Sequence, residues 1–477
     1  MRISDVDIKG VTADSRKVKE GYLFAALPGS KVDGCDYISS AIEKGAALIL
    51  MPRSVPVPKG VSVPVMQSDN PHQDFAKICA RFYKYQPAHI VAVTGTNGKT
   101  STAYFAQQIW DKLGYPAASL GTLGVHSSIF VREGGMTTPD PVHLHEMLAE
   151  MAKAGIDYLA MEASSHGLDQ YRLDGVKVAA AAFTNLTQDH LDYHVDMERY
   201  FQAKARLFSE LLESNGTAVV NADSDYFLSV KEICDERNIK VIDYGFNADR
   251  YHIIEAKPVS SGIQLKLNIN DESYEFILPL VGLFQVKNIL AALGLVLSTT
   301  DIEDAAAIEV LKHIKGTPGR LQFIDGHPKG AGAYVDYAHT PDAIDNVLTS
   351  LRPHTEGKLI CVFGCGGDRD RSKRPLMGKS AVAGADIAIL TDDNPRSEDP
   401  ARIRADVLGG VPDGNIMEIG DRRKAIYKAL DMAEKGDIVV VTGKGHETGQ
   451  IIGSEVFPFN DVDEVKKAID KMELSSA

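Results

Sequence analysis

The sequence has few cysteines for its length, and this shortage argues against a disulfide framework or a cysteine-based zinc site. Its 477 residues contain five cysteines, scattered along the chain and odd in number: Cys35, Cys79, Cys234, Cys361 and Cys365. Three residues, rather than two, separate Cys361 from Cys365, and no second pair is present to complete a zinc site. We therefore expect reduced thiols in a cytosolic protein.

Basic charge and long apolar runs are also lacking. The 51 lysines and arginines are outnumbered by 65 aspartates and glutamates, and the net charge of −14 argues against a general nucleic-acid binder. The negative net charge does not exclude anionic small-molecule substrates, because single loops of an acidic protein can be basic. No apolar run has the length of a membrane span, and Met1–Asp7 has acids where a signal peptide has an apolar core. We expect a cytoplasmic protein without nucleic-acid partners or membrane insertion.

The length exceeds what one hydrophobic core usually serves and predicts two to four domains. The pattern of expected strands and helices changes twice along the sequence, which indicates α/β domains over residues 1–88, 89–315 and 316–477. In the first domain we expect two strands and two helices, over 21–27, 46–51, 37–44 and 70–85.

The central and third segments alternate strands with helices, which predicts mostly parallel sheets covered on both faces. Central strands are expected at 90–93, 158–162 and 178–183, helices at 100–113 and 286–297, and an antiparallel addition at 253–280. Strands of the third segment are expected at 333–335, 359–363, 386–390 and 438–441. Binding sites in such sheets gather at the carboxyl ends of strands.

Residues 94–101 read Thr-Gly-Thr-Asn-Gly-Lys-Thr-Ser, directly after an apolar strand and before a helical pattern. Gly95 and Gly98 allow backbone N–H groups to approach phosphate oxygens, and the helix N-terminus adds partial positive charge. Lys99 can reach the β- and γ-phosphates, and Thr100 can ligate Mg²⁺. The spacing is unusual, because Val93 stands six residues before the lysine, where the P-loop motif has glycine. The strand and helix context nevertheless predicts nucleotide binding rather than an ordinary turn.

Further polar residues follow other strands of the central segment. Glu162 ends an expected strand, where it can act as a second Mg²⁺ ligand or serve only as a helix cap or surface acid. The cluster Asp189–His194 can bind a metal or only form hydrogen bonds within a loop. Lys204 lies on an amphipathic pattern, where a surface ion pair is the default interpretation.

Four polar, glycine-rich loops follow the strands of the third segment, and together they predict a binding site. Asp336 ends the first strand and is suited to ribose hydroxyls, and the arginines of Gly364–Arg371 are suited to an anionic group. The other two loops are Asp392–Arg396 and Gly443–Glu447.

Together these motifs resemble those of the Mur ligases, ATP-dependent enzymes that build the stem peptide of the cell wall. The resemblance covers nearly the whole chain, in the segments 14–16, 94–101, 137–139, 162–172, 184–194, 319–320, 336–342, 364–375, 393–396 and 443–447. It implies a small N-terminal α/β domain for the UDP end of the substrate, a central P-loop ATPase with a mostly parallel sheet, and a C-terminal Rossmann-like domain for the incoming amino acid.

The resemblance also implies roles for single residues. Catalytic roles fall to Lys99, Glu162, His190 and Lys204. ATP contacts are Gly95, Thr96, Asn97, Gly98, Lys99, Thr100, Ser101, Asn288, Arg320 and Asp336. The UDP-N-acetylmuramoyl dipeptide is held by Ser15, Ser30, Lys31, Val32, Thr137, Thr138, Ser164, Gln170 and Arg172. Mg²⁺ is held by Thr100, Glu162, His190 and Lys204, the last as a carbamate, which reverses the surface interpretation of this lysine and gives the metal an oxygen ligand.

The incoming amino acid is implied by the loop Asp393-Asn394-Pro395-Arg396. Family members that add meso-diaminopimelate carry Asp-Asn-Pro-Arg there, and a guanidinium can pair with the distal carboxylate that lysine lacks. Arg369, Gly443 and Glu447 match the remaining contacts. The implied product is an amide on the γ-carboxylate of D-glutamate, made through an acyl phosphate by a monomer whose third domain closes over the site.

Three alternatives stay open. The same reaction can use L-lysine, and a folylpolyglutamate synthetase-like ligase shares the ATPase architecture. The third alternative is a binding module that acts as a nucleotide switch. Such switches usually have the guanine-reading motif Asn-Lys-x-Asp, which is missing from this sequence.

Overall fold

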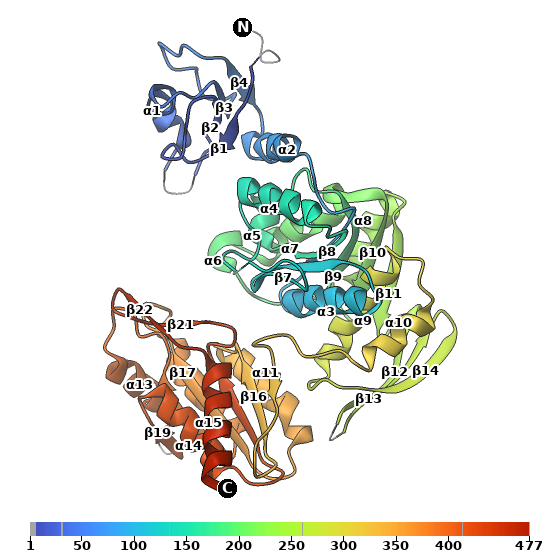
Figure 1. Cartoon of the computed structure of the whole chain (residues 1–477), viewed down its shortest axis with the longest axis vertical. Coiled ribbons are helices and arrows are strands. Elements are labelled where there is room, and N and C mark those ends of the chain that lie inside the picture. The colour runs from blue at the N-terminus through green and yellow to red at the C-terminus, as the bar shows by residue number, and fades with distance from the viewer. Residues whose placement is uncertain (1–5, 30–31, 133, 260, 413, 477) are drawn as a thin grey trace. The chain divides into compact units, whose positions relative to one another are not determined.

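The computed structural model describes residues 6–29, 32–132, 134–259, 261–412 and 414–476. The chain divides into two compact units. Figure 1 labels the helices and strands of both. The first comprises Met1–His252, Ile269–Asp271 and Lys287–Val310, and the second comprises Ile253–Asn268, Glu272–Val286 and Leu311–Ala477.

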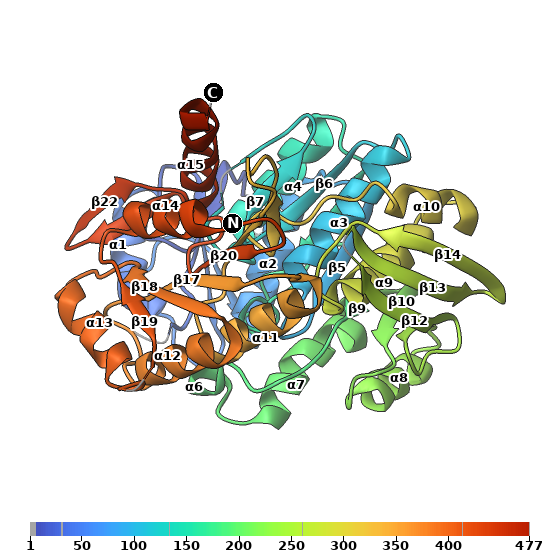
Figure 2. The same cartoon turned by 90° about the horizontal axis from the view of Figure 1, so that it is seen from below.

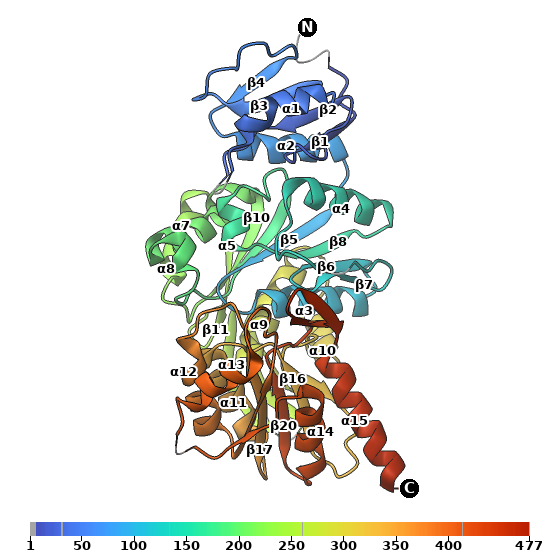
Figure 3. The ribbon, with the colours of Figure 1, turned by 90° about the vertical axis from the view of Figure 1, so that its left-hand side faces the viewer.

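The N-terminal part of the first unit is a parallel four-stranded sheet in the order β1-β2-β3-β4. Its strands are β1 (Gly10–Thr12), β2 (Tyr22–Ala25), β3 (Leu48–Pro52) and β4 (Val65–Ser68). Alternate residues of β3 enter two cores: Ile49 packs with the residues of α1 (Ile38–Glu43), and Leu50 packs with those of α2 (Pro71–Tyr83). Figure 3 shows both helices with this sheet. A short 3₁₀ turn (Gly34–Tyr37) precedes α1 and carries Cys35, which is partly exposed, whereas the other four cysteines are buried.

The large central sheet has ten strands in the order β14-β13-β12-β11-β10-β9-β5-β8-β6-β7. From β11 to β6 all neighbours are parallel, and β7 is an antiparallel edge. The bounds are β5 (His89–Thr94), β6 (Ala117–Gly121), β7 (Gly124–Ser127), β8 (Tyr158–Glu162), β9 (Val178–Phe183), β10 (Leu212–Asn221), β11 (Lys240–Gly245), β12 (Tyr251–Val259), β13 (Gly262–Ile269) and β14 (Glu272–Leu278).

The helices connecting these strands are α3 (Lys99–Lys112), α4 (Pro141–Lys153), α5 (Ser165–Asp169), α6 (Leu191–His194), α7 (Met197–Arg206), α8 (Phe227–Glu236), α9 (Phe284–Leu297) and α10 (Asp304–Leu311). The α3 helix packs on β5, β6 and β8, and Figure 2 shows it beside β5 and β6. Strand β5 lies between β9 and β8. The strands that follow it in sequence are added first on the β8 and β6 side and later on the β9 and β10 side, so the strand order switches at β5. Such a switch in strand order opens a crevice at the carboxyl ends of parallel strands.

The second unit contains a six-stranded sheet in the order β15-β16-β20-β17-β18-β19, parallel except for the edge strand β15. Its strands are β15 (Gln322–Ile324), β16 (Gly332–Asp336), β17 (Leu359–Cys365), β18 (Ile387–Asp392), β19 (Ile416–Glu418) and β20 (Ile438–Thr442). A separate antiparallel hairpin joins β21 (Gly449–Ile452) to β22 (Glu455–Pro458).

Successive side chains of β17 point to opposite faces of this sheet, and helices cover both faces, which gives three layers. Cys361 packs with the core under α11 (Pro341–Leu351), α12 (Lys373–Gly384) and α13 (Pro400–Leu408), whereas Val362 packs under α14 (Arg422–Met432) and α15 (Asp461–Ser476). A parallel strand covered on both faces therefore reads as an unbroken apolar run.

The predicted α/β class and the mostly parallel sheets are confirmed, and β8 and β9 have the predicted bounds. The expectation of two strands in the N-terminal domain is wrong, because β1 and β4 complete a sheet of four. The prediction also missed β6, β7, β10 and β11 of the central sheet, the short edge strands β15 and β19, and the β21–β22 hairpin. Within the described ranges, the structure contains no helix that is both long and apolar enough to span a membrane.

Candidate functional site

The phosphate loop joins the end of β5 to the start of α3, and its glycines are required by its geometry. Gly98 caps α3 in a left-handed conformation with φ 87°, and Gly95 has φ 145°. A Cβ atom at Gly95 would lie 1.9 Å from Thr184 Oγ1, and one at Gly98 would lie 2.3 Å from Asn288 Oδ1. The predicted ATP contact Asn288 thus lies beside the loop. Thr100 and the buried Ser101 belong to the first turn of α3.

Two lysine ammonium groups converge on the carbonyl oxygen of Gly95. Lys99 Nζ donates to it at 2.8 Å and to Thr96 O at 2.7 Å, and Lys204 Nζ donates to Gly95 O at 2.9 Å. The Lys204 side chain, on α7, is 1% exposed and its ammonium lies 4.4 Å from the centre of the Tyr200 ring. A surface ion pair, the interpretation favoured by helical periodicity alone, is therefore wrong for Lys204. Burial, and then the charge of Lys99, holds the pKa of Lys204 well below its usual range.

Side chains after β9 hold the loop from the other side. Asn97 N donates to Asn185 Oδ1 at 2.9 Å, and Thr184 Oγ1 donates to Asn97 O at 2.6 Å. Thr96 Oγ1 lies 3.2 Å from the Tyr200 hydroxyl. Sequence reasoning gave no role to Asn185 or Tyr200, although Asn185 lies within the marked segment 184–194 and Tyr200 lies on the same expected helix as Lys204.

Glu162 lies next to the phosphate loop because its strand pairs in parallel with β5, in the register Val93↔Glu162. Its carboxylate accepts Thr122 N at 2.8 Å, and it is 2% exposed. The Thr122 hydroxyl is also 3.0 Å from Thr137 Oγ1, so the carboxylate and the predicted substrate residue Thr137 share one hydrogen-bonded network.

The remaining predicted dipeptide contacts are joined by Thr138. Its hydroxyl donates to Glu162 O and accepts from Ser164 N, each at 3.0 Å. Arg172 Nη1 donates to Thr138 O at 2.8 Å, and Arg172 Nη2 donates to Gln170 Oε1 at 2.7 Å. Burial lowers the pKa of Arg172. Thr138, Ser164, Gln170 and Arg172 thus form one connected group next to Glu162.

His190 precedes α6 in a left-handed conformation and belongs to an aromatic group. Its ring centre lies 4.9 Å from that of His166 and 6.2 Å from that of Tyr200. Its Nε2 is 3.5 Å from Asp189 Oδ2. Among the residues that the structure describes, histidine, cysteine and acidic side chains nowhere gather in threes to hold a metal. A metal here would therefore need other oxygen ligands as well.

Predicted nucleotide contacts also occur in the second unit. Both oxygens of Asp336 accept backbone N–H groups, from Leu321 at 2.7 Å and from Ala338 at 2.7 Å. Burial raises the pKa of this carboxyl. The guanidinium of Arg320 stacks 4.4 Å above the ring of Tyr337. Asn288 belongs to the first unit and Arg320 to the second, so the predicted ATP contacts are divided between the units.

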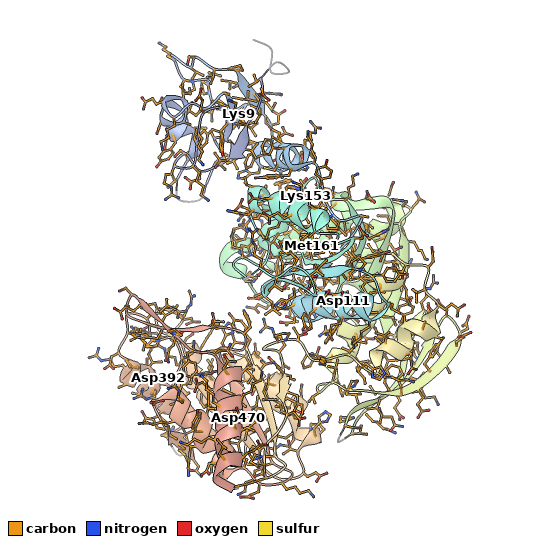
Figure 4. All side chains as sticks on the ribbon, viewed as in Figure 1. Lys9, Asp111, Lys153, Met161, Asp392 and Asp470 are labelled. Atoms are coloured by element: carbon orange, nitrogen blue, oxygen red, sulfur yellow. The ribbon has the colours of Figure 1, made fainter. Side chains whose placement is uncertain are left out.

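The loops after β18 and β20 bring together most of the residues predicted to bind the amino acid. Strand β18 ends at Asp392, which Figure 4 labels. Asn394 Nδ2 donates to Glu447 Oε2 at 2.9 Å, and a Cβ atom on Gly443 would lie 2.6 Å from Asp393 Oδ2. Pro395 is buried. These residues form a single cluster within the second unit.

The predicted carboxylate-binding arginines differ in their surroundings. Arg396 has φ 51°, and its Nη1 donates to Gly367 O at 2.7 Å, whereas Arg369 is exposed. Gly367 N donates to Asn394 O at 2.9 Å, which links the two loops. Sequence reasoning marked the loop Gly443–Glu447 but gave no role to its lysine, Lys444, which is fully buried among these residues.

Two predicted uridine contacts lie after neighbouring parallel strands of the N-terminal sheet. Ser15 follows β1, and its carbonyl accepts Lys44 Nζ at 2.9 Å. Val32 follows β2 and is 54% exposed. Ser30 and Lys31, predicted for the same site, lie outside the described residues.

Comparison with known proteins gives matches along the whole chain. Three family profiles match: the Mur ligase family catalytic domain over residues 7–85, the Mur ligase middle domain over 93–296, and the Mur ligase glutamate ligase domain over 319–445. The chain is 50% identical, over 98% of its length and 96% of the relative's, to a UDP-N-acetylmuramoyl-L-alanyl-D-glutamate–2,6-diaminopimelate ligase of Caulobacter vibrioides. It is 47% identical to the protein of the same name from Mesorhizobium japonicum, over 98% of this chain and 96% of the relative.

A solved structure is also similar. It is a UDP-N-acetylmuramoyl-L-alanyl-D-glutamate–2,6-diaminopimelate ligase with 36% identity and a TM-score of 0.74, and the match covers 98% of this chain and 95% of that one.

Proposed function

This chain belongs to the Mur ligase family, and we propose that it joins meso-2,6-diaminopimelate to the γ-carboxylate of D-glutamate in UDP-N-acetylmuramoyl-L-alanyl-D-glutamate, using ATP. The observation that carries this proposal is the 50% identity, across 98% of the chain, to a ligase named for that reaction. The product is a precursor of peptidoglycan. We propose domains over 1–88, 89–315 and 316–477, supported by profile matches at 7–85, 93–296 and 319–445.

ATP is bound by the phosphate loop. Backbone N–H groups from Gly95 to Ser101 and the N-terminus of α3 attract the phosphate oxygens, and Lys99 neutralises the charge that develops during phosphoryl transfer. Asn288, Arg320 and Asp336 serve the nucleoside. The short bonds that fix Asp336 support this role, because a fixed carboxylate can orient a ribose without reorganisation.

The residues present fit Mg²⁺, a hard cation that prefers oxygen ligands. Thr100 and Glu162 supply a hydroxyl and a carboxylate, and His190 completes the set with Lys204 as a carbamate. The lowered pKa of Lys204 supports the carbamate, because the neutral amine is the form that adds carbon dioxide. When bound, the ion would screen the phosphate charges and polarise the transferred phosphoryl group.

The substrate's dipeptide is held by Thr137, Thr138, Ser164, Gln170 and Arg172, and its uridine diphosphate by Ser15 and the 30–32 loop. The γ-carboxylate attacks the γ-phosphorus of ATP and gives an acyl phosphate and ADP. The amine of diaminopimelate then attacks the acyl carbon, and phosphate leaves as the amide forms. Arg172 orients the substrate carboxylate and Lys99 orients the phosphate for this transfer.

The far end of diaminopimelate is bound by the β18 and β20 loops. Arg396, with Arg369, pairs with its distal carboxylate, and Glu447, with Asp393 and Asn394, faces its distal ammonium. Pro395 and Gly443 shape the loops. We further propose that the enzyme is a cytoplasmic monomer. Its five unpaired cysteines agree with a reducing compartment.

The test is a competition between meso-diaminopimelate and L-lysine, with ATP and the UDP-muramoyl dipeptide. We expect the native chain to use diaminopimelate at least about a hundredfold better, because lysine leaves the guanidinium without its carboxylate. Arg396→Ala should lose at least about tenfold in kcat/KM for diaminopimelate. Equal use of the two amino acids by the native chain would contradict the proposed specificity.

A further inference from the structure

Lys444 is an ammonium group buried where the diaminopimelate loops meet. It follows β20, and its side chain has no exposed surface. Burying an ammonium is unfavourable unless its three N–H groups find acceptors. Here they find Gly449 O at 2.7 Å, Asn394 Oδ1 at 2.8 Å and Glu447 Oε2 at 3.2 Å. The lysine thus joins the stretch after β20, which carries Glu447 and Gly449, to the loop after β18, which carries Asn394.

These contacts fix the orientation of the Asn394 amide. Its Oδ1 accepts both Lys444 Nζ and Ile451 N, the latter at 2.9 Å. The oxygen therefore faces the lysine, and Nδ2 is turned to donate to Glu447 Oε2. Since the same Glu447 oxygen also accepts Lys444, the lysine holds both side chains that are proposed to receive the substrate.

The charges of this cluster leave room for one more cation. Lys444 Nζ lies 3.6 Å from Asp393 Oδ1 and 3.2 Å from Glu447 Oε2, so one ammonium faces two carboxylates. The nearby guanidinium of Arg422 is already paired with Asp461, at 2.6 Å and 2.8 Å. Asp393, Glu447 and Lys444 therefore have a net charge of about −1, and Arg396, in the same loop as Asp393, supplies +1. Together they match an end group with one ammonium and one carboxylate.

We propose that Lys444 is a positioning residue that sets amino-acid specificity, by orienting Asn394 and Glu447 and by limiting the cluster to a single uncompensated negative charge. This inference rests on the proposed function. Without the lysine charge, the two carboxylates would attract a bare ammonium more strongly, and the amide oxygen of Asn394 would keep only one of its two orienting hydrogen bonds, the one from Ile451 N. Selectivity would then move away from a zwitterionic end group and toward L-lysine.

The experiment compares Lys444→Met with Lys467→Met in the full chain. Lys467 also pairs with a glutamate three residues away, at 2.9 Å from Glu464, but its side chain is 61% exposed. For Lys444→Met we expect KM for meso-diaminopimelate to rise about tenfold or more, and the preference for diaminopimelate over L-lysine to fall by a similar factor. KM for ATP and for the UDP-muramoyl dipeptide should stay within about twofold, and Lys467→Met should match the native chain.

Phosphoryl transfer provides a measure of folding that does not involve the amino acid. ADP–ATP isotope exchange with the UDP-muramoyl dipeptide alone should persist in Lys444→Met. If methionine prevents folding, Lys444→Gln, which keeps a donor for Asn394 but not the charge, should show the same loss of preference.

The outcomes separate the two proposals. If the native chain ligates diaminopimelate but both Lys444 variants keep its KM and its preference over L-lysine, the role of Lys444 is overturned alone. If the native chain does not ligate diaminopimelate, the proposed function fails and this inference fails with it.

Discussion

Single residues of the phosphate loop are fixed by the atoms around them, and Gly95 gives the sharpest prediction. In Gly95→Ala the new methyl group would meet Thr184 Oγ1 at 1.9 Å and the backbone of Asn185 at 3.1 Å. The loop must then shift away from β9, and its positive φ adds strain of about 1 kcal/mol or more. We expect at least about a hundredfold loss in the rate of ATP-dependent ligation, because small displacements of a phosphate loop are costly in rate.

The control for this change is Gly409→Ala. Gly409 has φ −58° at the end of α13, and its nearest neighbour would be 3.4 Å from the added carbon. Its steady-state rates and thermal unfolding midpoint should equal those of the native chain. Full activity of Gly95→Ala would mean that the loop can adopt another conformation.

The sequence identified the residues of this site that belong to a local motif better than it identified the long-range contacts that they make. Lys99 and Gly98 could be read from a strand, a turn and a helix, because these are local features. The burial of Lys204 could not be read from its local pattern, since it depends on Tyr200 and on the distant Gly95 carbonyl, and only the family resemblance marked this lysine. Lys444 was missed for the same reason, because Asn394, 50 residues away in sequence, provides one of its acceptors.

At the scale of elements, α4 carries a buried histidine that should couple stability to pH. His145 Nε2 donates to Asp174 O at 3.2 Å, and burial lowers the pKa of His145 from 6.5 to about 4. The unfolded chain therefore binds a proton more readily than the folded chain between these values. Stability from the neutral ring is fully present above pH 6.5 and is lost as the pH falls toward 4, by up to about 3 kcal/mol.

The measurement is the free energy of unfolding in urea at pH 7.5 and 4.5. His145→Gln should lower stability at pH 7.5, but its difference from the native chain should shrink by about 2–3 kcal/mol at pH 4.5. A constant difference for His145→Gln would show that this ring does not titrate with folding.

Elements were predicted well where burial on both sides produced a clear apolar run. Strands β8, β9 and β17 are of this kind, and helix α3 was found from its periodicity and the preceding glycine. Strand β15 was missed because it has three residues, with Phe323 53% exposed, so its sequence lacks a core pattern. The 207–211 segment continues α7 in sequence but forms a π-helical turn, which helical periodicity does not distinguish.

At the scale of the whole molecule, the predicted nucleotide contacts belong to both compact units. Asn288 and the phosphate loop are in the first unit, and Arg320 and Asp336 are in the second. A ligand that contacts both sets should favour arrangements in which they face one another. We expect small-angle scattering to show a smaller radius of gyration with a non-hydrolysable ATP analogue and the UDP-muramoyl dipeptide together. The Arg320→Ala chain should show less compaction, and an identical scattering curve for the native chain with and without ligands would contradict closure.

The uneven burial of the five thiols leaves Cys35 as the site where a thiol reagent can attach to the chain. Cys35 is partly exposed, whereas Cys79, Cys234, Cys361 and Cys365 are buried. Burial and the neighbouring Asp33 raise the pKa of Cys35 to about 11, so its nucleophilic thiolate is scarce at neutral pH and becomes about tenfold more abundant with each added pH unit. A maleimide dye applied briefly under mildly alkaline conditions should therefore attach there first. A fluorophore could in this way be installed on the N-terminal sheet without altering the gene.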